Sequence, residues 1–355
     1  MIINFLIIIQ GIMKKELPIN VQHKINNQLC NAGFLCILLV YENMEKWLYE
    51  HYVQLYYSPN KCILSSKQKE MFLDFYGGWT EPREMLCIDS LNRKDVEKFD
   101  ADSFKKIINE EKYIYCYVDE YYIQKSKHNS HDILIYGYDD ERQVFQVVGY
   151  KERFFQGYEV DYNTFIKAFY SGIKISKMFD TYHGVNYFLC IKPYMDKIFN
   201  YEFHLEKFEE KLYEYIDNVN TGILNACDDL NHKMYQKEDN VYGIKVYECL
   251  ISEIEMCKKK LILLDYRAFH TLYEHNMLMR ARLEILPVEV SKELKQRIDE
   301  LVNISNKVRM LVMKYDFEPS LGVLERIIRE TGRMYELEKE SYTSLYECIY
   351  QANLW

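Results

Sequence analysis

The chain has 355 residues, 48% of them hydrophobic and 28% charged, so it is long enough for two domains with substantial cores. Its formal net charge of −9, without a basic stripe, argues against nucleic-acid binding. The apolar start is too short to span a bilayer and lacks the basic residues of a signal peptide. We therefore expect residues 1–12 to be disordered or loosely packed, with no membrane as partner.

The ten cysteines are scattered through apolar runs, as buried thiols are. None forms a C-x-x-C pair, and no histidine stands at ligand spacing beside them, so the sequence predicts no metal site. Reduced thiols are typical of a reducing compartment, and we expect a cytoplasmic protein.

A long apolar segment follows the polar residues 21–29. Between Asn31 and about Tyr57 there is no proline, and apolar residues recur on one side and then all round. This pattern predicts one long helix, buried along much of its length.

The start of that helix places a cysteine where it can be reactive. Asn26 or Asn27 can serve as N-cap, so Cys30 lies in or just before the first turn. Unpaired N–H groups and the helix dipole there stabilise a thiolate and lower the pKa of a cysteine below about 8.5. The alternative is that Cys30 is a small buried hydrophobe. Cys36, almost two turns further on among leucines and isoleucine, is predicted to be inert.

Residues 58–112 are turn-rich, with a short surface helix towards their end. Residues 113–152 then contain three runs rich in Tyr, Val and Ile, which predict consecutive antiparallel strands, the last two joined by a turn at 139–142. His131 opens the middle strand, where an imidazole is anchored yet open to solvent. A structural or surface histidine is the alternative interpretation.

The rest of the chain changes from mixed to helical character. A helix is predicted at 160–172 and a strand at 183–194. Helical periodicity then continues almost to the end of the chain, at 202–219, 222–237, 243–285, 288–315 and 320–350. We therefore predict an α+β domain over residues 13–197 and an all-helical domain over 198–355.

A cysteine at a helix start, followed much later by a histidine that opens a strand, is the chain order of papain-like enzymes. In such sites the thiolate attacks a carbonyl or thioester carbon, and the imidazolium holds the thiolate and handles the proton. A third polar group orients the imidazole, and an oxyanion hole binds the developing charge.

Three segments carry a family resemblance: CNAGFLCILLVY at 30–41, VDEYYI at 118–123 and HDILIYGYDDERQVFQVVGY at 131–150. They resemble the N-terminal domain of butirosin biosynthesis protein H-type proteins, which belong to the papain-like superfamily and are distantly similar to C39-like peptidases. The resemblance covers roughly residues 15–195. The helical half more loosely resembles relatives encoded near nonribosomal assembly genes, among them the amide-forming enzyme of closthioamide-type assembly.

The resemblance implies a papain-like fold and amide formation. An acyl group would leave a carrier-protein thioester, rest on the enzyme cysteine and be captured by an amine substrate. Cys30 would be the nucleophile and His131 the base. No cofactor is implied beyond the phosphopantetheine that arrives on the acyl or peptidyl carrier protein.

The sequence departs from the papain-like pattern after the histidine. Gly149 stands where an Asp or Asn is expected. If residues 113–122 pair antiparallel with 131–138, Asp119 lies near His131, and Asp119 is our predicted orienting group, ahead of Glu120 and Glu152.

A second departure concerns the oxyanion hole. Lys24 stands where the family has a glutamine, so Gln28, Asn27 or Gln22 would substitute, together with the Cys30 backbone N–H.

Two alternative functions remain open: one uses Cys30 and His131, and the other uses neither residue. A cysteine peptidase or amidase would use the same dyad with water as nucleophile, and a non-catalytic interaction protein would use the helical half.

For a carrier protein, two basic segments of the helical half qualify as docking patches: Lys258, Lys259 and Lys260 with Arg267, and Arg326, Arg329 and Arg333. Solvated helix faces are the alternative for both.

Overall fold

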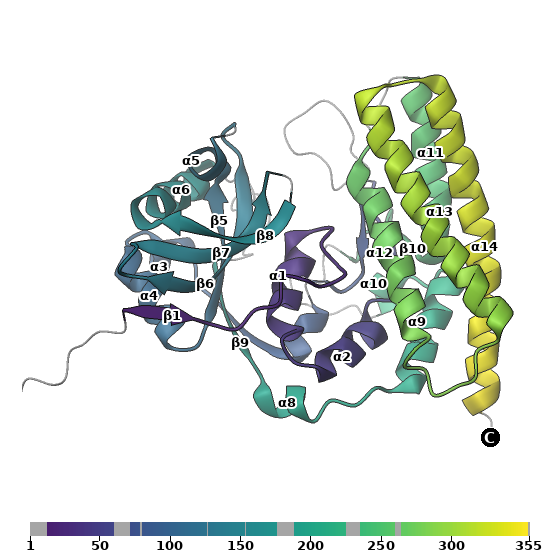
Figure 1. The fold of residues 1–355 in the computed structure, drawn as a ribbon, viewed down its shortest axis with the longest axis horizontal. Helices are drawn as coiled ribbons and strands as arrows, with labels where there is room; N and C mark the ends of the chain where they lie inside the picture. The colour runs from purple at the N-terminus through teal and green to yellow at the C-terminus, as the bar shows by residue number, and fades with distance from the viewer. Residues whose placement is uncertain are drawn as a thin grey trace, which may run out of the picture. The chain divides into compact units, whose positions relative to one another are not determined.

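The computed structural model describes residues 13–59, 72–78, 80–125, 127–152, 154–175, 188–224, 235–259 and 264–353. The predicted loose N-terminus, residues 1–12, lies outside them. The chain divides into two compact units, each made of two separate segments. The first unit is Met1–Tyr41 with Pro82–Ile198, and the second is Glu42–Glu81 with Phe199–Trp355. Both units are shown in Figure 1.

The predicted two-domain division needs one correction. The boundary expected at 197/198 lies one residue from the division between Ile198 and Phe199, but residues 42–81 belong to the helical unit. The reason is packing: α2 (Asn43–His51) contacts α9 (Leu205–Ile216) and α12 (Tyr266–Arg282). The predicted long helix is accordingly wrong, because it is divided between the two cores.

The first unit is built on an antiparallel sheet, to which seven strands of the described residues contribute. The strand order is β4-β9-β5-β6-β7-β8, and β1 pairs with β6. The strands are β1 (Lys14–Glu16), β4 (Leu86–Ser90), β5 (Tyr113–Asp119), β6 (Ser130–Asp139), β7 (Val144–Lys151), β8 (Phe154–Asp161) and β9 (Phe188–Pro193). The three predicted strands and their antiparallel order are confirmed.

Helices cover both faces of this sheet. The helices are α1 (Leu29–Leu38), α3 (Arg93–Val96), α4 (Ala101–Asn109), α5 (Glu120–Gln124), α6 (Tyr162–Ile175) and α8 (Met195–Phe199), with η1 (Glu81–Glu84) at the division between the units. On α1, Gly33 lies against Tyr115, whereas on α6 an added Cβ at Gly172 would come within 2.7 Å of the Val118 backbone. Because Tyr115 and Val118 point to opposite faces of β5, α1 and α6 cover opposite faces.

The second unit is helical around a small sheet. Among its described residues the helices are α2, α9, α10 (Thr221–Leu224), α11 (Val246–Lys258), α12, α13 (Lys292–Phe317) and α14 (Leu321–Asn353), with η2 (Gly243–Lys245). The strands β10 (Val241–Tyr242), β2 (Leu55–Tyr57) and β3 (Leu73–Phe75) pair antiparallel in that order. The prediction of a helical C-terminal region is confirmed, although 243–285 forms two helices rather than one.

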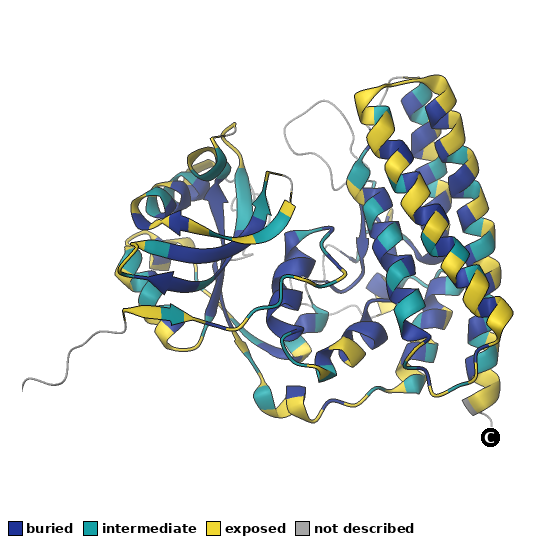
Figure 2. Cartoon of the chain, in the orientation of Figure 1, coloured by how far each residue is buried: buried dark blue, intermediate teal, exposed yellow. Residues whose placement is uncertain are grey.

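The burial pattern follows these layers (Figure 2). The helix α1 is buried along its whole length, whereas α13 and α14 alternate buried and exposed positions, as amphipathic helices do. In the described ranges of the chain, no helix has the length and apolarity needed to cross a membrane.

Candidate functional site

Cys30 lies in the first turn of α1, as predicted. The helix begins after Gln28, whose side chain makes no capping hydrogen bond, and its first turn carries no acidic residue. Cys30 itself is only 9% exposed. First-turn N–H groups and the helix dipole make this end of α1 electropositive, so the position suits a thiolate or another anion.

His131 forms an ion pair with the residue that follows it. Its Nδ1 lies 2.7 Å from Oδ1 of Asp132, and the two side chains are 35% and 14% exposed. Burial disfavours the imidazolium, but the charge of Asp132 and its hydrogen bond outweigh burial and raise the pKa of His131 to about 9. In the same way, against the effect of burial, His131 and Tyr115 lower the pKa of Asp132. At neutral pH the pair is therefore an imidazolium and a carboxylate.

Tyr115 connects this pair to the cysteine helix. Its hydroxyl donates a hydrogen bond to Oδ2 of Asp132, and its ring stacks on Phe34 of α1 with 5.8 Å between centroids. Burial and then the charges of nearby groups, Asp132 and Cys30 among them, raise the pKa of Tyr115. Since α1 also packs against β6 and β7, Cys30 and His131 lie on adjoining elements.

Tyr150 makes a second connection. Its ring lies edge-on to the His131 imidazole, with 6.0 Å between centroids. Its hydroxyl donates to the backbone carbonyl of Asn26, in the segment that leads into α1. The imidazole is therefore held beside the chain that delivers Cys30.

The structure corrects the prediction that Asp119 orients His131. The strand register is as expected, with Val118 opposite His131 and Asp119 opposite Ser130. However, the Asp119 carboxylate is committed to two other side chains, His128 Nδ1 and Ser171 Oγ, both at 2.6 Å. Asp119 also accepts the backbone N–H of Tyr121 as N-cap of α5, and this cap turns it away from the imidazole.

The sequence contained one sign of Asp132, because Asp132 directly follows His131 at the start of the strand. However, neighbouring side chains of a regular strand point to opposite faces, so strand geometry argues against contact between His131 and Asp132. At the mouth of β6 the His131 ring turns along the chain instead, with Nδ1 3.2 Å from the Asp132 carbonyl oxygen.

The other candidates for the orienting role have different surroundings. Glu120 accepts amide hydrogen bonds from Gln124 and Asn129, and its charge is a further cause of the raised pKa of His131. At Gly149, where a carboxylate was expected, an added Cβ would lie 3.3 Å from the Tyr158 hydroxyl. A tyrosine from β8 thus fills the space that an Asp or Asn would need.

The two predicted oxyanion residues differ in position. Asn27 is buried, and its Oδ1 accepts from the Asn31 side chain at 3.1 Å, so its amide oxygen is engaged within the segment. Gln28 is the N-cap, and its backbone carbonyl accepts the N–H groups of Asn31 and Ala32. The Gln28 side chain makes no capping hydrogen bond at this helix start.

A second cysteine–histidine contact in the first unit has the opposite character. Cys36 Sγ lies 3.4 Å from His23 Nε2. Burial raises the pKa of Cys36 strongly and lowers that of His23 to about 4, so both groups are neutral. This matches the prediction that Cys36 is an inert, desolvated thiol.

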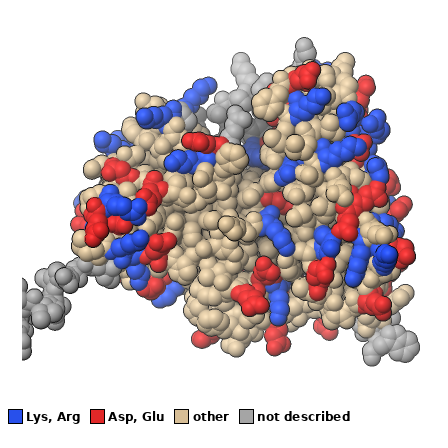
Figure 3. Space-filling view, viewed as in Figure 1, with Lys and Arg blue, Asp and Glu red and all other residues tan. Residues whose placement is uncertain are grey.

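The predicted basic patches of the helical unit are partly neutralised. Lys258 pairs with Glu255, Arg267 with Asp265, and Arg333 with Glu300, while Lys260 lies outside the described residues. Lys259, Arg326 and Arg329 are exposed, and Arg329 lies 3.7 Å from the Glu330 carboxylate. Figure 3 shows positive and negative side chains interspersed over the helical unit on the face in view. Neither patch is a large field of one sign.

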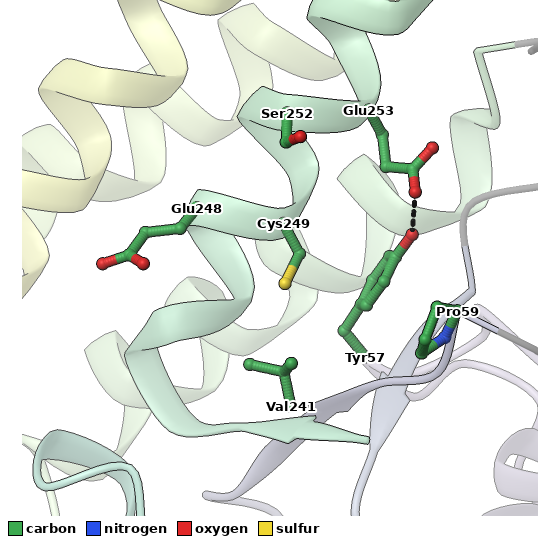
Figure 4. A pocket seen from close by; sticks show the side chains of 7 residues that line it. All are labelled: Tyr57, Pro59, Val241, Glu248, Cys249, Ser252 and Glu253. Carbon is green, nitrogen blue, oxygen red and sulfur yellow. Dashed lines mark hydrogen bonds between the residues drawn. The ribbon is translucent and has the colours of Figure 1, made fainter. Parts of the chain in front are cut away.

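The helical unit contains a hollow that is an alternative candidate site (Figure 4). It has a volume of about 340 Å³, and Tyr57, Val241, Cys249 and Glu253 are among its lining residues. The Tyr57 hydroxyl donates to Glu253 at 2.7 Å, and the Cys249 sulfur points towards Tyr57 and Val241. The Tyr57 hydroxyl and the Glu253 carboxylate of this hollow are thus bonded to each other.

Over the residues that the structure describes, no group of three or more His, Cys, Asp or Glu is arranged to hold a metal ion.

No protein-family model matches the chain, and a search of curated proteins finds no match either.

Proposed function

We propose that the first unit is a papain-like cysteine acyltransferase that forms an amide from a carrier-bound thioester and an amine. The observation that carries the proposal is the His131–Asp132 ion pair, which keeps an imidazolium beside a helix whose electropositive start bears Cys30. An imidazolium and a helix start both stabilise a thiolate. The family resemblance supplies the substrate class.

The reaction proceeds in two balanced steps. In the first, the Cys30 thiolate attacks the thioester carbonyl, a new thioester bond forms to Cys30, and the carrier thiol leaves with a proton from His131. In the second, the amine nitrogen attacks the acyl-Cys30 carbonyl, the carbon–sulfur bond breaks, and His131 takes the amine proton. Asp132 holds the imidazole in place throughout, and N–H groups at the start of α1 face the developing oxyanion.

The test is turnover of an acyl carrier-protein thioester with an amine. Cys30→Ala should abolish amide formation with the fold intact, and mass spectrometry of the wild-type chain should show the acyl group on Cys30. Cys36→Ala is the matched control and should retain activity. Normal turnover of Cys30→Ala, or loss only in Cys36→Ala, would disprove the assignment. Release of the free acid in place of the amide would assign a hydrolase.

The two catalytic groups should behave as one unit. His131→Ala should remove nearly the whole chemical rate, and the double variant with Cys30→Ala should lose little more. Additive losses would mean that the two residues do not cooperate.

A carrier protein presents an acidic helix, so its docking site on the helical unit should be locally basic. Arg326 and Arg329 are exposed on α14 and remain our first choice, with Lys259 as a second. Arg326→Glu with Arg329→Glu should raise KM for the carrier-linked substrate several-fold, and added salt should mimic the change. A small thioester without the carrier should be unaffected.

The control is an equal change of charge on another helix: Lys292→Glu with Lys295→Glu, two exposed lysines of α13. An equal rise of KM in both double variants would show a general charge effect instead of a docking site. An unchanged KM in both double variants would show that Arg326 and Arg329 are solvated surface residues with no docking role.

A further inference from the structure

Tyr115 contacts both Asp132 and α1, the helix that carries Cys30. It is not among the site residues predicted from the sequence. We propose that Tyr115 is a positioning residue, whose hydroxyl fixes the Asp132 carboxylate so that the other carboxylate oxygen holds Nδ1 of His131. This inference rests on the proposed acyl transfer, because it names a residue that keeps that reaction's base in place.

The sheet register explains why these groups meet. Tyr117 pairs directly with Asp132, and Tyr115 precedes Tyr117 by two residues on β5, so it lies on the same face. Diagonal neighbours of this kind are within reach of long aromatic side chains. Oδ2 of Asp132 accepts the Tyr115 hydroxyl, while Oδ1 lies 2.7 Å from His131 Nδ1. With both oxygens held, the carboxylate cannot rotate about its own bond.

Burial makes the hydroxyl hard to replace. Tyr115 has no exposed surface, and the Asp132 side chain is 14% exposed, so solvent has little access to the bond between them. The Tyr115 ring packs on α1, against Gly33 and Phe34. The same side chain that fixes Asp132 is therefore fixed by the helix that carries Cys30.

The experiment compares Tyr115→Phe with Tyr113→Phe in the full chain. Tyr113 lies on the same strand and face, is also buried, and donates its hydroxyl to the Pro18 carbonyl instead of a carboxylate. Both variants lose one buried hydroxyl. The first readout is the midpoint of the Asp132 carboxyl carbon titration by NMR. It should rise by about one to two pH units in Tyr115→Phe, as expected when a carboxylate loses a charged hydrogen bond. Tyr113→Phe should match wild type.

The second readout is kinetic. Tyr115→Phe should lower kcat by about ten-fold with KM unchanged, because the imidazole is less well held rather than the substrate less well bound. An unchanged Asp132 midpoint would overturn the inference, and so would a raised midpoint with wild-type kcat and wild-type Cys30 reactivity.

Alkylation of Cys30, followed by peptide mass spectrometry, separates this inference from the proposed function. If the wild-type chain forms no amide, the proposed acyl transfer is wrong. The alkylation rate of Cys30 still tests whether Tyr115 is a positioning residue. Slower Cys30 alkylation in Tyr115→Phe than in Tyr113→Phe supports the role, and equal rates disprove it.

Discussion

Each unit of the protein places a carboxylate beside a histidine and a tyrosine hydroxyl. The histidine and carboxylate are both charged in one cluster, whereas burial disfavours both charges in the other. In the sheet unit, Asp132 and His131 form an ion pair at 2.7 Å. In the helical unit, Glu338 accepts hydrogen bonds from the hydroxyls of Tyr215 and Tyr247, and lies 3.7 Å from Nδ1 of His275.

The pKa values show the contrast. Burial raises the pKa of Glu338 to about 7, despite the hydrogen bonds that it accepts. Burial, and then the charge of Arg282, lowers the pKa of His275 to about 3. Arg282 is itself fully buried and donates to two backbone carbonyls at 2.6 Å. A second cation beside Arg282 is disfavoured, so His275 stays neutral and donates from Nε2 to the Val53 carbonyl.

The difference teaches that the residue types alone do not make a reactive site. Direct contact at the mouth of a strand gives a charged pair, which our proposal places beside the Cys30 thiolate. Complete burial beside a guanidinium keeps His275 neutral and disfavours the charge of Glu338, in a cluster that joins α9, α11, α12 and α14. We therefore expect loss of charge to affect turnover at the first cluster and stability at the second.

The largest expected effect comes from Asp132→Asn. The amide keeps the shape of the side chain but removes the charge that stabilises the imidazolium. Turnover should fall by roughly 10²–10⁴-fold, as for other orienting carboxylates. Glu338→Gln is the matched substitution in the other cluster and should leave turnover within about two-fold of wild type. Similar losses in both variants would contradict the comparison.

The pH dependence should separate the clusters next. The pKa of His131 is raised from 6.5 to about 9, so its contribution to stability is fully present below pH 6.5 and is lost as the pH rises through 9. We expect the alkaline limb of kcat/KM near pH 9, moving towards pH 6.5 in Asp132→Asn. A limb that stays near pH 9 in the variant would show that Asp132 is not its cause.

Asp119→Asn tests whether any buried carboxylate with a histidine contact matters for turnover. Asp119 holds His128 and Ser171 and caps α5. Its amide variant should lose about 1–3 kcal/mol of unfolding free energy in denaturant titrations, with turnover changed by about two-fold or less. A loss of turnover comparable to that of Asp132→Asn would restore Asp119 to the site.

The smallest expected effect is that of Glu338→Gln on stability. The pKa of Glu338 is raised from 4.5 to about 7, so its contribution is fully present below pH 4.5 and is lost as the pH rises through 7. The glutamine has no such titration. Denaturant unfolding at pH 8 should therefore show the variant more stable than wild type, by on the order of 1 kcal/mol, with the advantage vanishing at acid pH. A variant that is less stable at pH 8 would mean that the carboxylate is ionised and well compensated.

The sequence predicted the elements that carry the site better than its third member. Strand periodicity placed His131 at the mouth of β6, and the end of a polar segment placed Cys30 at the start of α1. These depend on local patterns of apolar residues, which a sequence displays directly. The assignment of Asp119 failed because strand register fixes which residues are opposite, but not which way a side chain turns at a strand end.

The same limit explains the long helix predicted from Asn31 to Tyr57. Apolar content is high throughout, but α1 and α2 bury their surfaces in different units, and β2 follows. Tyr115 was overlooked for a related reason: it is one of 33 tyrosines, and only the fold shows that its hydroxyl meets a carboxylate.

The division of each unit into two chain segments has a consequence for synthesis on the ribosome. The helix α1 is made early but cannot pack until β5, β6 and β7 have emerged. Residues 42–81 wait longer, because α9, α11 and α12 come more than a hundred residues later in the sequence. Meanwhile Trp47, Tyr52 and Tyr56, all buried in the finished unit, are exposed on a nascent chain. Such a segment is a natural binding site for chaperones and a point where aggregation begins, so folding of this part of the nascent chain waits for α9, α11 and α12.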